Sequence, residues 1–303
     1  MSQPSDGLCL ELAYRPPLQW EALLEFLAAR VIAGVEVVRD GCYRRIVRAG
    51  VCDQHPVGWI EVRHLAQRRT LALQIDPNLR DAVAPVLAGV RRLFDLDSDP
   101  EAIALALGQI AHREPGLRVP GAIDGFELAV RAILGQQVSV KAAHTLAGRL
   151  ARRFGSAIET GIQGLELVFP LPQAIAQARE TDLAELGIVA QRAGAIHTLA
   201  RAVCEGRVRL EPGAPVAEQI AALRTVPGIG DWTAQYIAMR ALGCPDAFPA
   251  ADLVLMRALG VSTAARAREV AAQWIPWRSY AVMHLWRAQA GASQRNRPAP
   301  AVK

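Results

Sequence analysis

Two different spacings of hydrophobic residues divide the chain near residue 98. Before that point, apolar side chains recur at every second position, which is the period of a strand with one buried face. Asp40 and Gly41 form a favoured two-residue hairpin turn between two of these runs. The pattern predicts helices at residues 20–33 and 78–96, and strands at residues 8–14, 35–38, 43–47, 57–65 and 69–75.

After residue 98, nearly every segment carries apolar residues three or four positions apart, which is the period of one helix face. Two segments differ: residues 165–169 read as a short extended insertion, and the proline-rich residues 294–303 as disordered. Helices are predicted at residues 100–112, 125–136, 140–154, 172–178, 182–186, 190–205, 216–224, 231–242, 252–259, 264–274 and 280–291.

The order of these elements indicates an α+β fold, in which a small N-terminal antiparallel β-sheet with helices precedes a mostly α-helical core. We expect residues 1–98 to form the N-terminal domain and residues 124–244 to form a helical domain. Residues 99–123 should return to pack with residues 245–292 as a second helical subdomain, and residues 293–303 should form a flexible tail.

Residues 224–259 contain the most informative local pattern. A helical run ends at Arg224, the tripeptide Gly-Ile-Gly follows at residues 228–230, and apolar residues resume at helical spacing from Trp232. Glycines can adopt backbone conformations closed to other residues and let amide N–H groups approach a phosphate closely. The positive end of the following helix points to the same place. The pattern predicts a helix-hairpin-helix that grips a nucleic-acid backbone.

An aspartate follows this hairpin at the start of a further helix. Asp252 precedes an apolar run that begins at Leu253, so its carboxylate fits the N-cap position. A carboxylate at that position is held in place by backbone amides. The whole stretch therefore combines a backbone grip with a fixed carboxylate nearby.

The composition indicates that the binding partner is negatively charged. The net charge of +5 and the pI of about 9.2 favour an anionic partner, and Lys141 and Lys303 are the only lysines. The five cysteines are scattered without a close-spaced metal-binding pattern, so we expect reduced thiols in a cytoplasmic protein and no iron–sulfur cluster. Neither a signal peptide nor a membrane span is predicted.

Three separated motifs carry a resemblance to a known family. They are Val-Pro-Gly-Ile-Gly-Asp-Trp-Thr-Ala at residues 226–234, Ala-Phe-Pro-Ala-Ala-Asp at 247–252 and Trp-Arg-Ser-Tyr at 277–280. Further similarity covers residues 126–140. In this order they resemble bacterial DNA-3-methyladenine glycosylase II, a family of the helix-hairpin-helix DNA glycosylase superfamily, over most of the chain.

The resemblance implies a hydrolase acting on double-stranded DNA that contains alkylated bases. It would flip out 3-methyladenine or a related N-alkylpurine and excise it with water, leaving an abasic site in base excision repair. Asp252 would be the catalytic residue, because a carboxylate stabilises the positive charge that develops on the sugar or orients the water. Trp232 stands where relatives that also cleave the backbone carry a Schiff-base lysine. The resemblance therefore implies a monofunctional enzyme.

Aromatic residues would form the base pocket. Trp232, Tyr236 and Trp286 match pocket residues of the family, and Phe26 matches a further residue of the cleft. Alkylation at purine N3 or N7 leaves a cationic base, and an aromatic face attracts a cation by about 0.5–2 kcal/mol. A purely structural role in the core is the alternative, above all for Phe26.

Other matched positions imply contacts with DNA and with an ion. Gln137 occupies the place of a residue pushed into the gap left by the everted base, where close relatives carry an apolar wedge. The backbone carbonyls of Arg224, Val226 and Ile229 match those that hold a monovalent structural cation, and no other cofactor is implied. His284 reads as a packed or DNA-facing residue. The positions expected to bind DNA are Gln136, Gln137, Gly228, Ile229, Gly230 and Thr233.

Two residues depart from the family pattern. Asp231 replaces a residue that is basic in close relatives and is interpreted as an N-cap, although its charge would repel a nearby phosphate. Leu253 follows Asp252 where relatives carry an aromatic residue. These departures concern affinity and the shape of the pocket, while the reaction class depends on Asp252.

Two other functions stay open. One is an oxidised-base glycosylase with lyase activity, against which the missing motif lysine counts. The other is a non-catalytic helix-hairpin-helix protein that binds damaged DNA, against which Asp252 and the aromatic set count. We expect a monomer that is associated with the nucleoid in the cytoplasm.

Overall fold

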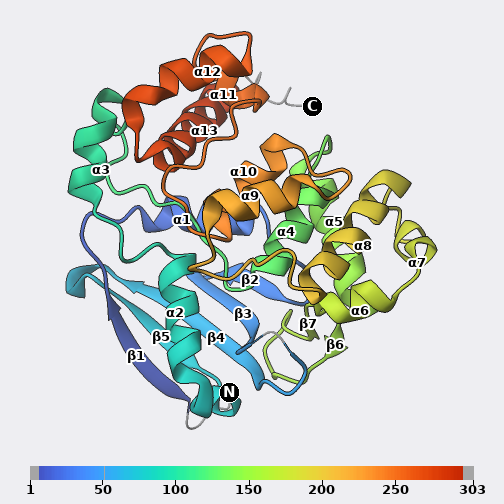
Figure 1. The fold of residues 1–303 in the computed structure, drawn as a ribbon. Coiled ribbons are helices and arrows are strands. Elements are labelled where there is room, and N and C mark those ends of the chain that lie inside the picture. Colours follow the sequence, from blue (N-terminus) through green and yellow to red (C-terminus); the bar gives the residue numbers. More distant parts are fainter. Residues whose placement is uncertain (1–6, 51, 296–303) are drawn as a thin grey trace, which may run out of the picture.

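A β-sheet lobe and a helical lobe lie side by side in the computed structural model, which describes residues 7–50 and 52–295 (Figure 1). The sheet is antiparallel throughout, in the order β1-β5-β4-β3-β2. The predicted sheet and the α+β class are confirmed. The five strands are β1 (Leu8–Ala13), β2 (Glu36–Arg39), β3 (Cys42–Arg48), β4 (Val57–Leu65) and β5 (Thr70–Ile75).

The β2–β3 hairpin has the predicted turn. Arg39 pairs with Cys42, which leaves Asp40 and Gly41 as the two turn residues. Both have positive φ, 56° and 70°. A turn with two positive φ values matches the right-handed twist of the flanking strands, so it closes the hairpin without splaying them.

The helix predicted over residues 78–96 is two segments. A 3₁₀ segment, η2 (Pro77–Ala82), precedes the α-helix α2 (Val83–Leu93). The prediction of one helix was wrong because Pro85 has no amide hydrogen and its ring clashes with the preceding turn inside a continuous helix. Pro85 is instead accommodated in the first turn of α2. Helix α1 (Trp20–Ala28) and α2 bury their apolar residues against the sheet.

The helical lobe contains the remaining α-helices in the predicted order. The extended insertion contains a short strand that pairs with another, and Leu165 and Val168 pack against Ile46 and Trp59 of the sheet. The α-helices are α3 (Pro100–Leu107), α4 (Gly125–Leu134), α5 (Val140–Phe154), α6 (Pro172–Gln177), α7 (Glu180–Ala184), α8 (Ala190–Cys204), α9 (Val216–Arg224), α10 (Asp231–Arg240), α11 (Leu253–Ala258), α12 (Ala264–Ala271) and α13 (Arg278–Arg295). The short elements are η1 (Ala66–Arg68), η3 (Gly108–Ile110), η4 (Ala272–Trp274), β6 (Ser156–Ala157) and β7 (Leu167–Val168).

Two hydrophobic cores meet along α10. Ile237 packs into a core with α4, α5, α8 and α9, whereas Met239 packs into a second core with α3, α11, α12 and α13. Ile103 and Leu107 of α3 belong to this second core, so residues 99–123 do lie against the C-terminal helices. These contacts support the three-part division, which we retain as a proposal.

The C-terminal boundary differs from the expected one. Helix α13 continues to Arg295, so residues 293–295 are helical, and residues 296–303 of the expected tail lie outside the described residues. Within the described part of the chain, no helix is long and apolar enough to cross a membrane.

Buried ion pairs attach α4 to the sheet. Arg45 of β3 lies 2.6 Å from Glu127 of α4, and Arg131 of α4 lies 2.7 Å from Glu36 of β2. Burial raises the pKa of Glu36, but the nearby guanidinium groups of Arg131 and Arg45 outweigh it and leave the pKa below its usual value. Removing one partner of such a pair costs about 3–5 kcal/mol. The pairs therefore fix the helix that leads into Gln136 and Gln137.

Candidate active site and DNA interface

The hairpin between α9 and α10 is anchored by its apolar residues. Val226 and Ile229 are buried in the core beneath it. Gly228 has φ of 88°, and a Cβ atom there would lie 3.0 Å from the Cβ of Ala195. Glycine is therefore required at this position by both conformation and space.

Gly230 does not have the unusual backbone conformation expected of it. Its φ of −86° is open to any residue, and it is the N-cap of α10 without a side-chain cap. A Cβ atom at Gly230 would meet no atom within 4 Å. The positive end of α10 therefore has open space beside Gly230, which an approaching phosphate requires.

Asp231 is not an N-cap, so that interpretation was wrong. The backbone is already helical at Asp231, and its carboxylate points away from the amides toward α12. Oδ2 lies 3.1 Å from Nη2 of Arg268. This ion pair offsets the negative charge that the sequence places beside the hairpin.

Asp252 is held by three N–H donors. It is the predicted N-cap of α11, and its Oδ1 accepts a hydrogen bond of 2.8 Å from the amide of Leu255. The indole Nε1 of Trp232 donates to Oδ2 at 2.8 Å, and Nε1 of Trp286 donates to Oδ1 at 3.2 Å. The carboxylate is therefore fixed relative to both tryptophans. Leu253, next to it, is 73% exposed.

The predicted aromatic residues come together around this carboxylate. The rings of Trp232 and Tyr236 stack at 5.3 Å with an interplanar angle of 8°. Trp286 lies 6.2 Å from Tyr236 at 43°. With Asp252 they line a cavity of about 530 Å³ whose opposite wall comes from α4 and α5. The cavity has the size and the apolar lining of a site for a small molecule or a base.

Phe26 lies outside this lining. Two guanidinium groups lie over its ring, with Cζ of Arg30 3.7 Å and Cζ of Arg240 4.8 Å from the ring centroid. Both arginines line the cavity. Phe26 therefore supports the cavity from behind.

Gln136 and Gln137 point in different directions. The side-chain amide of Gln136 donates to the carbonyl of Gly228 and to Oγ1 of Thr233, each at 2.9 Å. Thr233 is buried, so Gln136 and Thr233 tie the α4–α5 turn to the hairpin. Gln137 is exposed at the turn with φ of 54°. Of the two glutamines, Gln137 is therefore the exposed one.

Sequence analysis missed all four arginines that line the cavity. Arg131 is neutralised by Glu36 and Glu127, whereas Arg30 has no ion-pair partner among the described residues. Burial lowers the pKa of Arg30. The cavity arginines come from separate parts of the chain, and no local motif connects them. The four are Arg30 just after α1, Arg131 of α4, Arg240 of α10 and Arg257 of α11.

Arg240 also tunes its aromatic neighbour. It donates to the hydroxyl of Tyr236 at 2.7 Å and to the carbonyls of Pro120 and Gly121 at 2.6 and 3.2 Å. Burial raises the pKa of Tyr236, but Arg240 and Arg30 outweigh that effect and lower it overall. The ring and hydroxyl of Tyr236 are thereby fixed in the cavity wall.

The backbone carbonyls of Arg224, Val226 and Ile229 have the chemistry of a site for a hard cation. They are uncharged oxygens, and that of Val226 also accepts the amide of Ile229 at 3.0 Å. Within residues 7–50 and 52–295, no group of three His, Cys, Asp or Glu side chains could hold a metal ion. His284 lies on α13 and is buried, so it is packed, which is one of the two roles expected for it.

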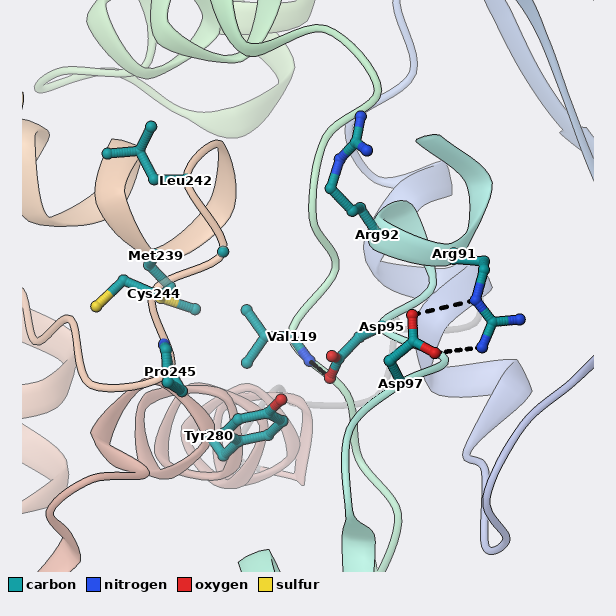
Figure 2. Close-up of a pocket in the computed structure, with 11 residues that line it drawn as sticks. Arg91, Arg92, Asp95, Asp97, Val119, Met239, Leu242, Cys244, Pro245 and Tyr280 are labelled. Carbon is teal, nitrogen blue, oxygen red and sulfur yellow. Dashed lines mark hydrogen bonds and ion pairs between the residues drawn. The ribbon is translucent and has the colours of Figure 1, made fainter. Parts of the chain in front are cut away.

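A second, smaller cleft lies at the other end of α10. It measures about 240 Å³ between α2, the loop around Val119 and the start of α13 (Figure 2). Asp95 accepts the amide of Val119 at 3.3 Å, and burial raises the pKa of Asp95 to about 6. Arg91 forms an ion pair with Asp97 at its rim. The cleft is a junction between the two lobes, remote from Asp252.

Two family models match the chain in succession. The AlkA N-terminal domain matches residues 9–124, and the HhH-GPD superfamily base excision DNA repair protein matches residues 130–273. The fold, the hairpin and the held aspartate together define a helix-hairpin-helix base excision DNA repair protein.

Whole-length relatives narrow the class. DNA-3-methyladenine glycosylase 2 of Escherichia coli (strain K12) is 38% identical over 275 residues, which cover 91% of this chain and 95% of the relative. The chain belongs to the DNA-3-methyladenine glycosylase II family of N-glycosylases, which confirms the resemblance. The probable bifunctional transcriptional activator/DNA repair enzyme AlkA of Mycobacterium tuberculosis (strain CDC 1551 / Oshkosh) is 40% identical over 91% of this chain and 56% of its own length.

A solved structure has the same fold. The 3-methyladenine DNA-glycosylase from Archaeoglobus fulgidus superimposes with a TM-score of 0.77 at 24% identity, covering 93% of this chain and 98% of that one. The similarity therefore extends across both lobes.

Proposed function

We propose that the protein flips an alkylated base out of double-stranded DNA and hydrolyses its N-glycosidic bond, with 3-methyladenine as the chief substrate. One observation carries this proposal: the carboxylate of Asp252 is held by two indole N–H groups at an aromatic cavity large enough for a base. The product would be a free base and an abasic site.

Asp252 is the proposed catalytic residue. Cleavage of the bond develops positive charge on the deoxyribose, and a fixed carboxylate stabilises that charge without having to reorient. Its position is set by the amide of Leu255 as well as by Trp232 and Trp286. Because the three donors restrict the rotation of the carboxylate, its negative charge stays in one place in the site.

Trp232, Tyr236 and Trp286 are proposed to hold the everted base. Their rings present an electron-rich wall, which favours a cationic alkylated purine over a neutral one by about 0.5–2 kcal/mol per contact. Phe26 would act indirectly, by holding Arg30 and Arg240 in place. The weakened glycosidic bond of the alkylated nucleotide would supply the rest of the selectivity.

The hairpin and the α4–α5 turn are proposed to hold the duplex. The amides near Gly228, Ile229 and Gly230 would bind a phosphate, and Gln137 would fill the space of the everted base. A monovalent cation held by the carbonyls of Arg224, Val226 and Ile229 would strengthen the phosphate contact. Gln136 and Thr233 would keep these two parts in register.

The enzyme is proposed to be monofunctional. Trp232 occupies the position where a Schiff-base lysine would stand, and Lys141 on α5 does not line the cavity. Borohydride trapping on methylated duplex DNA should give no crosslinked protein, whereas a crosslink would show a lyase step. We further propose a monomer that acts in the cytoplasm, where the chromosomal DNA of a bacterium lies.

Free-base release from methylated duplex DNA tests the function. Chromatography of the reaction with the wild-type protein should show 3-methyladenine, while DNA damaged only by oxidation should release much less base. Tight binding of methylated DNA without release of any base would instead support a damage-binding protein.

A further inference from the structure

Arg257 is an exposed cation in the lining of the cavity. It lies on α11, its side chain is exposed, and it lines the cavity together with Asp252. No carboxylate among the described residues forms an ion pair with it. Two exposed arginines of α12 differ from it in this respect. Arg266 is paired with Glu269 at 2.6 Å, and Arg268 is paired with Asp231 at 3.1 Å.

The spacing from the catalytic carboxylate suits a phosphate. Arg257 lies five residues after Asp252 on the same helix, which is about 8 Å along the axis. The proposed function puts the deoxyribose of the everted nucleotide over Asp252. A phosphate attached to that sugar then lies within reach of the long side chain of Arg257, on the α11 side of the cavity.

Asp231 reduces the positive charge that the hairpin offers to DNA. At the hairpin, the negative charge of Asp231 opposes the approach of DNA, and its pairing with Arg268 leaves no net positive charge. Trp232, which bonds Asp252 and directly follows Asp231, connects the two places.

We propose that Arg257 binds a phosphate flanking the everted nucleotide, and that the Asp231–Arg268 pair withholds Arg268 from the DNA. This rests on the proposed function for the placement of the nucleotide.

Salt dependence of DNA binding tests the proposal. The probe is a fluorescent duplex containing a stable tetrahydrofuran abasic-site analogue, titrated with the full-length protein at several salt concentrations. Each phosphate contact contributes about 0.9 to the slope of log K against log salt concentration. Arg257→Gln should lower the magnitude of the slope by about 0.9 and weaken binding to all sequences alike, whereas Arg257→Lys should keep most of the slope.

The matched control is Arg266→Gln, which removes an exposed arginine of α12 that is already paired. It should leave the slope unchanged. Asp231→Asn should raise the magnitude of the slope by about 0.9, because Arg268 is then free to meet a phosphate. A wild-type slope for Arg257→Gln, or an equal loss for Arg266→Gln, would overturn the phosphate contact.

An unchanged slope for Asp231→Asn would overturn the withheld role of Arg268. Binding of the abasic probe is independent of base release, so failure of the wild type to release a base would count against the proposed function alone. Circular dichroism and the melting temperature of each variant check that it folds. If Arg257→Gln does not fold, the slope of Arg257→Lys still tests the contact.

Discussion

The indole Nε1 of Trp232 lies 2.8 Å from Oδ2 of Asp252, so the stacking wall and the carboxylate form one rigid unit. The two residues come from different elements, α10 and the start of α11. A base that stacks on this wall is therefore positioned against the carboxylate that acts on its sugar.

Trp232→Phe separates these two roles. Phenylalanine keeps a ring to stack against Tyr236 but has no N–H for Asp252. A hydrogen bond to a charged group is worth about 1.5–3 kcal/mol, so we expect the single-turnover excision rate to fall by roughly tenfold to a hundredfold. Trp277→Phe is the control, because Trp277 packs edge-on against Tyr280 and does not line the cavity. Equal rates for wild type and Trp232→Phe would refute the positioning role.

Gln137→Gly tests the wedge. It removes the side chain proposed to fill the DNA, and it relieves a positive φ, so stability should stay the same or rise by up to about 1 kcal/mol. Fluorescence of 2-aminopurine next to the lesion should report less eversion, with a matching loss of excision. Full eversion by this variant would exclude Gln137 as the wedge.

Gln136→Ala should behave differently from the wedge variant. It removes the donor to both the half-buried Gly228 and the buried Thr233, and leaving a buried acceptor unpaired costs about 1–3 kcal/mol. We expect a lower midpoint in urea unfolding together with weaker eversion. An unchanged midpoint would show that the turn and the hairpin are not held together by this side chain.

His284 should make the protein sensitive to acid. Burial lowers its pKa to about 4, with attraction from Glu114 opposing, against about 6.5 in an unfolded chain. The unfolded state therefore binds the proton first, so stability is complete above pH 6.5 and falls as pH drops toward 4. The loss over this window is about 3 kcal/mol.

Urea unfolding at pH 7.5 and pH 4.5 measures this loss. His284→Leu should flatten the difference between the two pH values, while the exposed His112→Gln should not change it. The same pH dependence in wild type and His284→Leu would assign the acid sensitivity to other groups.

The sequence predicted elements best where their ends carry local signals. The bounds of α5 match the prediction because Ser139 caps its start and the helix stops at Gly155. The turn at Asp40 was likewise visible in two residues. The helix over residues 78–96 was wrong where Pro85 interrupts it, which periodicity alone does not register.

The site was predictable only as far as its motif is contiguous. Asp252, Trp232 and Tyr236 belong to one stretch of chain, and the structure brings them together as expected. Arg30 reaches the cavity from the turn after α1 and Arg131 from α4, and only the packing of the two lobes places them there. The pairing of Asp231 with Arg268 is also a contact between distant residues, so the charge at the hairpin could not be judged from sequence.

The most direct test of the account is release of free 3-methyladenine from methylated duplex DNA by wild type and Asp252→Asn in parallel. Asparagine can still accept the amide of Leu255, so the fold should persist, but the negative charge is lost. We predict that release falls by at least about a hundredfold while binding to an abasic-site duplex stays within about threefold. Release at the wild-type rate, or an equal loss of release and binding, would contradict a catalytic role for Asp252.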